Sequence, residues 1–383
     1  MRKNDRFPSY PFPGRPGPQP APVLAFLRDS APVARVSLPS GELAWLVTRH
    51  EANRRFLADP AFSRAAATTG AGPRLRSRPP APSLAAMDPP EHTRLRKLVT
   101  GAFSGATVTR LRSWLDQAAD GLVRDVVAAG PPADLVSSLA RPLPFLAICE
   151  LLGVPESDHV PFHEWARAHL HGTDGDGLYE YLSGLVTVKR KEPGDDLLSE
   201  LAGVMEDAEL VALGSTLLVA GLEPAACLIA GSVQALLAHP AQLAALRRDP
   251  GLMTTAVEEL LRYVPIAVSG GTMRVALRAT SLSGQRIEAG EAVLPSTIAA
   301  NRDHRVFADP DQLDLARTPN PHLTFGHGPH RCLGAHLARA ELRSALTALL
   351  RHLPGMRSAL PEEEVTWRTT GLLRGPEHLP VTW

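Results

Sequence analysis

A single thiol lies between a glycine-rich loop and a helical pattern in the last quarter of the chain. The stretch "HLTFGHGPHRCLGAHLARAELRSAL", residues 322–346, contains Cys332, one of three cysteines, and four of the 14 histidines. Histidine beside cysteine raises the possibility of zinc, which in structural sites usually takes paired ligands at tight spacing. This stretch has one thiol, and the chain has no CxxC. The pattern therefore disfavours zinc, and the misplaced third glycine disfavours a dinucleotide-binding loop.

A thiolate at the start of a helix supports a different chemistry. Backbone N–H groups and the helix dipole would stabilise the anion of Cys332. The glycines before it let the backbone lie close beneath a flat group. One soft anionic ligand held in such a loop is what a haem iron with a thiolate axial ligand requires. The alternative interpretation is a buried structural cysteine.

The loop "FGHGPHRCLGAHLARAE" resembles the haem-binding loop of the cytochromes P450, and the similarity to that family extends from about residue 40 to the end of the chain. The resemblance implies haem b as the cofactor, with the thiolate of Cys332 as the metal ligand. It also implies cofactor contacts for Phe325, Gly326, His330 and Gly334. The matching positions are Phe325, Gly326, Gly328, His330, Cys332, Leu333, Gly334, Leu337, Ala338, Arg339 and Glu341.

Further segments match the same family. "MDPPEHTRLRKLV" resembles the start of its third major helix, which implies that His92 and Arg96 face the haem propionates. By the same resemblance, Arg274 in "TMRV" and His330 supply the remaining cationic contacts. Cations opposite two carboxylates are favourable in a site closed to water.

The segment "EELLRY" carries the family's Glu-x-x-Arg pair as Glu259 and Arg262. Residues three apart on a helix share a face and can form an ion pair. By resemblance this pair anchors the irregular segment "NRDHRVFADPDQLDLARTPNPH", residues 301–322, where Arg317 completes a structural network.

One motif departs from the family pattern. In "VAGLEPAAC", the catalytic positions Ala220, Gly221 and Glu223 fit the pattern Ala-Gly-x-Asp/Glu-Thr, but Pro224 stands where the threonine belongs. In the family the threonine hydroxyl helps to hold oxygen and to relay protons. Proline has neither a hydroxyl nor an N–H group. It also costs about 3 kcal/mol in an ordinary helix interior.

This departure leaves the reaction open. The resemblance implies a haem-thiolate oxidase or monooxygenase of bacterial secondary metabolism, and the missing hydroxyl favours oxidative coupling or ring closure of a natural-product scaffold. The alternatives are hydroxylation or epoxidation with protons relayed by the substrate or by water, peroxide-driven oxidation, and a haem-binding protein without oxygenase activity. Glu223 argues against peroxide-driven oxidation of fatty acids, because it would repel a carboxylate.

The expected partners follow from the same resemblance. The sequence carries no flavin or iron–sulfur segment, so electrons would come from a ferredoxin and a ferredoxin reductase. An acidic ferredoxin would suit the cations Arg112, Arg331, Arg339 and Arg343. The substrate would be a small or carrier-bound natural product. Alignment with the family suggests an apolar pocket lined by Ala85, Ala86, Val219, Leu222, Ile266, Val268 and Leu372.

Composition bounds the remaining classes. The 383 residues carry formal net charge +0, with 44% hydrophobic and 21% charged residues. This is ordinary for a globular protein and gives no sign of a nucleic-acid partner. The start is Pro-rich and polar through about residue 20, without an apolar run of membrane-span length, and the cysteines are few and scattered. We therefore expect a cytoplasmic protein without a membrane partner.

The elements that must position these residues are mainly helical. Residues 105–130, 207–240, 240–250 and 254–265 have helical patterns, and a further one starts near Pro90. Strand patterns are confined to residues 43–48, 272–277, 280–296, 364–371 and 378–383, while residues 63–83 resemble a loop. The sequence predicts one mainly α domain over residues 1–383, and the resemblance implies the cytochrome P450 fold, a helix-rich triangular prism with small peripheral sheets.

Overall fold

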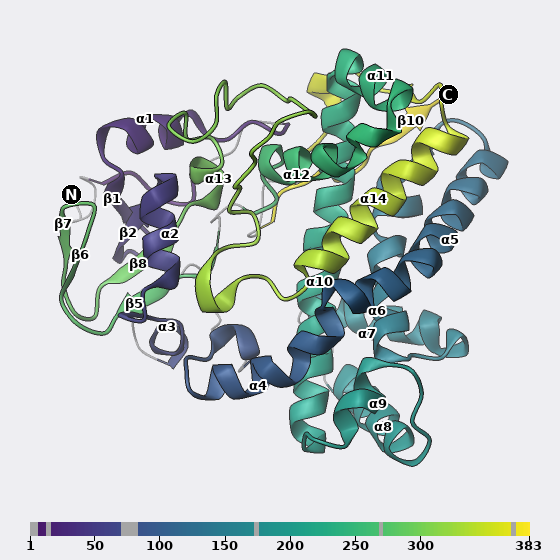
Figure 1. The fold of residues 1–383 in the computed structure, drawn as a ribbon, viewed down its shortest axis with the longest axis horizontal. Coiled ribbons are helices and arrows are strands. Elements are labelled where there is room, and N and C mark those ends of the chain that lie inside the picture. Colours follow the sequence, from purple (N-terminus) through teal and green to yellow (C-terminus); the bar gives the residue numbers. More distant parts are fainter. Residues whose placement is uncertain (1–6, 13–16, 70–82, 172–175, 268–270, 369–372) are drawn as a thin grey trace. The chain divides into compact units, whose positions relative to one another are not determined.

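The computed structural model describes the chain except for residues 1–6, 13–16, 70–82, 172–175, 268–270 and 369–372 (Figure 1). The fold consists of two compact units, each assembled from segments that are distant in the sequence. Unit 1 comprises Met1–Glu91, Ala230–Leu333 and Ser358–Leu379, and unit 2 comprises His92–Ile229, Gly334–Arg357 and Pro380–Trp383.

Unit 1 is built around a five-stranded sheet of order β1-β2-β8-β5-β3. Strands β2 and β8 are parallel, with Ala44 opposite Ala292, and the other neighbours are antiparallel. A separate hairpin pairs β6 with β7. The strands are β1 (Val33–Ser37), β2 (Leu43–Val47), β3 (Phe62–Ser63), β5 (Arg274–Ala276), β6 (Thr280–Leu282), β7 (Gln285–Ile287) and β8 (Ala292–Pro295).

Alternation along β2 explains why helices pack on both faces of this sheet. Ala44 and Leu46 belong to one apolar cluster, together with residues of α1 and α13. Trp45 and Val47 point the other way, into a cluster with α2. Successive side chains of a strand face opposite sides, so each face needs its own cover. The helices of unit 1 are α1 (Pro22–Ser30), α2 (His50–Ala58), α3 (Ala65–Thr69), α11 (Pro240–Arg248), α12 (Met253–Tyr263) and α13 (Thr297–Ala300), with short turns η1 (Leu84–Ala86), η5 (Pro250–Leu252), η6 (Gly328–His330) and η7 (Glu362–Glu364).

Unit 2 is mainly helical. Its helices are α4 (Glu91–Thr100), α5 (Gly105–Ala129), α6 (Pro142–Leu152), α7 (His159–His171), α8 (Gly177–Lys191), α9 (Leu197–Ala202), α10 (Asp207–Ala238) and α14 (Ala335–His352), with η2 (Gly101–Phe103), η3 (Val136–Ala140) and η4 (Glu156–Asp158). The strand β4 (Ala133–Asp134) pairs with β10 (Pro380–Thr382), and β9 (Arg357–Ser358) completes a small sheet. Helix α10 begins in unit 2 and ends in unit 1.

Helices α5 and α14 lie side by side (Figure 1). Ser104 caps α5 by accepting a hydrogen bond from the Thr107 amide, and Gly130 ends it with φ +79°. Both helices bury an apolar stripe, which in α5 includes Leu115 and Val123.

One carboxyl group is buried within that stripe. Burial raises the pKa of Glu341, on α14, from 4.5 to about 8. The folded state therefore holds a proton that the unfolded state releases, and stability falls as pH rises from about 4.5 to about 8. We expect the wild-type protein to lose up to about 1.4 kcal/mol per pH unit across this window. Glu341→Gln should not show this loss, which urea unfolding at pH 5, 6.5 and 8 would measure. Parallel pH profiles of the two proteins would contradict the expectation.

Among the described residues, α10 is long and apolar enough to cross a membrane, with mean hydropathy 1.7 over its most apolar stretch. However, 67% of that stretch is buried inside the protein. A helix in the core of a protein can be equally long and apolar, so one helix with these two properties is weak support for a membrane span.

Most element predictions are confirmed. The helical patterns appear as α5, α10, α11 and α12, and residues 301–322 are irregular. The described part of residues 364–371 differs, because it holds a 3-10 turn and a single bridge at Trp367 instead of a strand. The bridge partner is Pro376, which has no N–H to continue a ladder. The predicted loop 63–83 contains the short helix α3.

Candidate active site

The cysteine loop in unit 1 is closed by its own backbone. The Cys332 amide donates to the Phe325 carbonyl at 2.8 Å, and the Gly326 amide donates to the Leu323 carbonyl at 2.8 Å. Cys332 is exposed, whereas Cys149 and Cys227 are buried. Burial raises the pKa of the Cys149 thiol to about 12, so that group stays protonated. Cys332 is therefore the one cysteine placed to act as a thiolate ligand.

Gly328 marks a close approach between this loop and α2. Its φ is +73°, and an added Cβ would lie 2.7 Å from the Leu57 carbonyl oxygen and 2.9 Å from the α-carbon of Ala58. Gly326 has a similar φ of +71° but open space where its Cβ would be. The loop thus needs glycine at 328 for space and at both positions for conformation.

These two glycines form a matched pair for mutagenesis. We expect Gly328→Ala to destabilise the protein by more than about 2 kcal/mol, because the left-handed conformation costs about 1–2 kcal/mol and a backbone clash is added. Gly326→Ala should incur only the conformational cost. Urea unfolding of both variants would measure the difference. Equal losses would show that the contact with α2 does not constrain the loop.

Arg274, on β5, is a buried cation that suits an anionic group. Its side chain donates to the Leu57 carbonyl at 3.0 Å and more weakly to that of Phe56 at 3.4 Å. Its Nε is buried without a hydrogen-bond partner among the described residues, and no carboxylate there lies within ion-pair distance. Burial lowers the pKa of Arg274 to about 10. A buried guanidinium in this state fits a ligand carboxylate such as a haem propionate.

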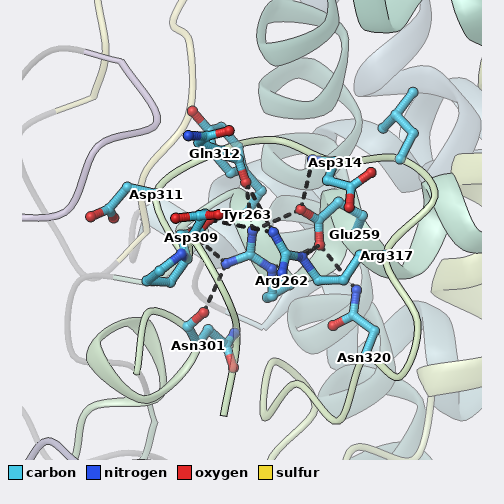
Figure 2. A network of polar contacts seen from close by, with 12 residues as sticks. Glu259, Arg262, Tyr263, Asn301, Asp309, Asp311, Gln312, Asp314, Arg317 and Asn320 are labelled. Carbon is cyan, nitrogen blue, oxygen red and sulfur yellow. Dashed lines mark hydrogen bonds and ion pairs between the residues drawn. The ribbon is translucent and has the colours of Figure 1, made fainter. Parts of the chain in front are cut away.

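The buried network of Figure 2 lies in the same unit and centres on Glu259. Both oxygens of Glu259 accept from Arg262, at 2.7 and 2.8 Å, and the side chains of this pair are fully inaccessible. Arg317 donates to Glu259 at 3.0 Å. Arg262 also donates to the Asn301 and Pro310 carbonyls at 2.9 and 2.7 Å. The three residues that the sequence singled out are in contact, and they bind the irregular segment to α12.

Three further residues, Asn301, Asn320 and Thr324, tie this network to the cysteine loop. Asn320 donates to Glu259 at 3.1 Å. Asn301 accepts from the Leu323 amide at 2.7 Å and donates to the Thr324 hydroxyl at 2.9 Å.

Thr324 in turn donates to the Leu261 carbonyl on α12 at 2.6 Å. Sequence reasoning missed these three, although two asparagines and a threonine in irregular segments next to a motif are a usable signal.

His92 and Arg96 lie on α4 in unit 2. His92 is buried, at 2% exposure, and Arg96 is half-buried one turn later on the same face. The structure thus presents this pair together. Arg274, His330 and Cys332 belong to unit 1.

The motif at residues 220–224 lies within α10. Helix α10 continues through Pro224. An added Cβ at Gly221 would lie 2.9 Å from Cδ1 of Ile148, so α6 packs against the backbone here. Ala220 is exposed, whereas Glu223 and Pro224 are half-buried.

The proposed pocket residues are dispersed over several elements. Ala85 and Ala86 form part of η1, and Val219 and Leu222 lie on α10, with Val219 37% exposed. Ile266 lines a cavity of about 110 Å³ that also contacts Arg262, Asn301 and Thr324. Val268 and Leu372 lie outside the described residues.

Metal ligation by a side-chain cluster finds no support in the described part of the chain. No group of three or more histidine, cysteine, aspartate or glutamate side chains is gathered there.

Comparison with known proteins places the chain among bacterial enzymes. Residues 189–355 match the family model described as Cytochrome P450. The chain is 48% identical to a nocardicin C N-oxygenase from Nocardia uniformis subsp. tsuyamanensis, covering 98% of each sequence. It is 44% identical to a mycinamicin IV hydroxylase/epoxidase from Micromonospora griseorubida, again covering 98% of each.

Solved structures show the same likeness. A mutant of the mixed-function P450 MycG in complex with mycinamicin V superimposes with a TM-score of 0.94 at 44% identity, covering 98% of this chain and 100% of the other. A cytochrome P450mel described as having biaryl coupling reactivity gives a TM-score of 0.89 at 36% identity, covering 97% and 98%.

Proposed function

Because the chain belongs to the cytochrome P450 family and is an oxidoreductase of that haem-thiolate type, we propose that it tailors a natural-product scaffold by oxidative coupling or ring closure. The family's fold, small sheets beside many helices, is the fold of this chain. The relatives include a nocardicin C N-oxygenase, a mycinamicin IV hydroxylase/epoxidase and a cytochrome P450 with biaryl coupling reactivity. The observation that carries the proposal is Pro224 in place of the usual threonine.

The residues proposed to hold the cofactor come from the cysteine loop, from β5 and from α4. Haem, when bound with a thiolate ligand, supplies dioxygen activation and one-electron oxidation. We assign the protein's bond to the haem iron to the exposed sulfur of Cys332. Arg274 and His330 in unit 1 would hold propionate oxygens by charge-assisted hydrogen bonds, and so would His92 and Arg96 on α4. Phe325, Gly326 and Gly334 would supply the loop surface against the ring.

Pro224 sets the proposed reaction. It brings no hydroxyl to donate or pass a proton, so the most direct relay to oxygen is missing. Glu223, the preceding residue, is the ionisable side chain next to this position. In coupling, the substrates lose two hydrogen atoms and no oxygen atom enters the product. These two hydrogen atoms, with two electrons from the donor protein and two protons from solvent, would reduce dioxygen to two molecules of water.

Oxygenation is the second candidate, because the relatives at 48% and 44% identity are oxygenases. A water or a substrate hydroxyl would then carry protons in place of the threonine. The intact Glu259 network and the buried Arg274 oppose a decayed, inactive haem binder. Glu223 opposes a peroxide-driven enzyme for fatty acids, since two carboxylates repel each other.

Isotope labelling separates the two candidates. Compounds that shift the Soret band would first be selected from a natural-product library, then turned over with a ferredoxin, its reductase and ¹⁸O₂. Coupling predicts a product lighter than the joined substrates by two hydrogens and free of label. Incorporation of ¹⁸O into the major product would overturn coupling in favour of oxygenation.

The electron donor is proposed to be an acidic ferredoxin with its reductase, in the cytoplasm. Burial is the main cause that lowers the pKa of Arg343 on α14. The charge of Arg112, nearby on α5, lowers that pKa further. Arg339 lies one turn before Arg343 on α14. Clustered cations of this kind accelerate association with an acidic partner at low salt.

A further inference from the structure

Proline at position 224 leaves one backbone carbonyl of α10 without its helical donor. In an α-helix the carbonyl of residue 220 accepts from the amide of residue 224. Pro224 has no amide hydrogen, and its ring pushes against that carbonyl and tilts it outwards. Because α10 continues as a helix through Pro224, the rest of the ladder stays in place around this gap. The Ala220 oxygen is therefore an acceptor available to another molecule.

The residue that bears this oxygen is exposed. Ala220 is exposed and Val219 is 37% exposed, so the surface of α10 is open at these two positions over the described residues. A methyl group is too small to screen the carbonyl. On the side of α10 that meets α6, Gly221 packs against Ile148, and that contact holds the helix in place.

The polar groups here are acceptors. Glu223 lies three residues after Ala220, so its carboxylate and the Ala220 carbonyl share a face of the helix. A threonine at 224 would have provided a hydroxyl donor to such a carbonyl, and proline provides none. A carbonyl that lacks its amide donor favours a ligand that donates a hydrogen bond, and the charge of Glu223 disfavours a ligand that carries a carboxylate.

We propose that the Ala220 carbonyl binds an O–H or N–H group of the substrate, and that the enzyme therefore acts on phenols, alcohols, amines or amides through the part of the molecule that bears the donor. This inference rests on the proposed function, since it assumes that α10 lines the substrate site. It adds the chemical class of the substrate. It also assigns the orientation of the substrate to a backbone carbonyl that Pro224 leaves without an amide donor.

A pair of biaryl probes tests the donor requirement. 4-Phenylphenol and 4-methoxybiphenyl differ in that only the first can donate, and biaryl shape suits a relative with biaryl coupling reactivity. Their Kd values for the ferric holoenzyme would be measured by calorimetry and by the Soret shift. One hydrogen bond predicts that the phenol binds about fivefold more tightly than the ether.

The variant Pro224→Ala restores an N–H group at residue 224, which then donates a hydrogen bond to the Ala220 carbonyl. Its helix should be at least as stable, so loss of folding is not expected. We expect the variant to lose its preference for the phenol, so that the two Kd values become about equal. Leu222→Ala is the matched control, because it alters the same helix and keeps the proline. It should change both Kd values together and preserve their ratio.

The outcomes separate this inference from the function on which it rests. Equal affinities in the wild type, no binding of 4-phenylphenol, or an unchanged ratio in Pro224→Ala would each overturn the donor site. The carbon monoxide spectrum of the same samples reports the haem-thiolate bond independently. A normal spectrum with a failed ratio test rejects only the donor site.

Discussion

Replacing Cys332 by serine abolishes the absorbance band near ~450 nm that the reduced, carbon monoxide-treated wild-type protein is expected to show. The band would depend on electron donation from a thiolate ligand to the haem iron, which a serine hydroxyl cannot supply. The described structure offers a single exposed sulfur in a closed glycine loop, so we expect complete loss instead of a partial change. Absorbance spectroscopy of the two purified holoproteins measures the effect.

Cys149→Ala provides the control for this experiment. Its thiol is buried in α6 and stays protonated, since burial raises its pKa to about 12. The variant should keep the ~450 nm band, apart from any loss of stability caused by the small cavity. A band that survives in Cys332→Ser and disappears in Cys149→Ala would overturn the assignment of the ligand.

The second large effect is expected at the centre of the buried network. Glu259→Ala leaves Arg262 charged and buried without its carboxylate, and breaking a buried pair in this way costs about 3–5 kcal/mol. Arg317 and Asn320 lose the same acceptor. Against a total stability of about 5–15 kcal/mol, this is a large fraction. We expect a much lower urea midpoint by circular dichroism, together with reduced haem content.

Glu288→Ala is a suitable comparison, because Glu288 pairs with Arg286 at 2.6 Å on the protein surface. Exposed pairs contribute little, so its urea midpoint should match that of the wild type. A wild-type midpoint for Glu259→Ala would show that the network does not stabilise the fold. Failure of Glu259→Ala to accumulate as folded protein, beside a normal Glu288→Ala, supports the prediction.

The sequence predicted those parts of the fold that local patterns determine. Residues 105–130 combine an apolar stripe with a terminal glycine, so both ends of α5 could be placed. The contact of Glu259 with Arg317 was reachable only through family resemblance, because the two residues lie 58 positions apart. Asn301 and Thr324 could not be assigned from the sequence, since their bonds depend on how two irregular segments meet.

The candidate site shows a similar division. Cys332 could be identified from the sequence, because the glycine-rich loop around it matches the loop that holds a thiolate ligand in the family. Arg274 could be named as a cation, but its buried and incompletely bonded state follows from packing against the carbonyls of α2. The close approach of Gly328 to Leu57 likewise depends on tertiary structure. Substrate identity depends on small differences in pocket shape that neither periodicity nor motifs encode.

The parallel pairing of β2 with β8 has a consequence for synthesis on the ribosome. Ala44 leaves the exit tunnel early, whereas its partner Ala292 is translated near the end of the chain. At about 5–20 residues per second, the early strand waits roughly 10 to 50 s for its neighbour. During that interval its apolar edge is open to wrong pairing with nascent chains nearby. Yield in a heterologous host should therefore respond to slower translation and to chaperones that bind extended apolar segments.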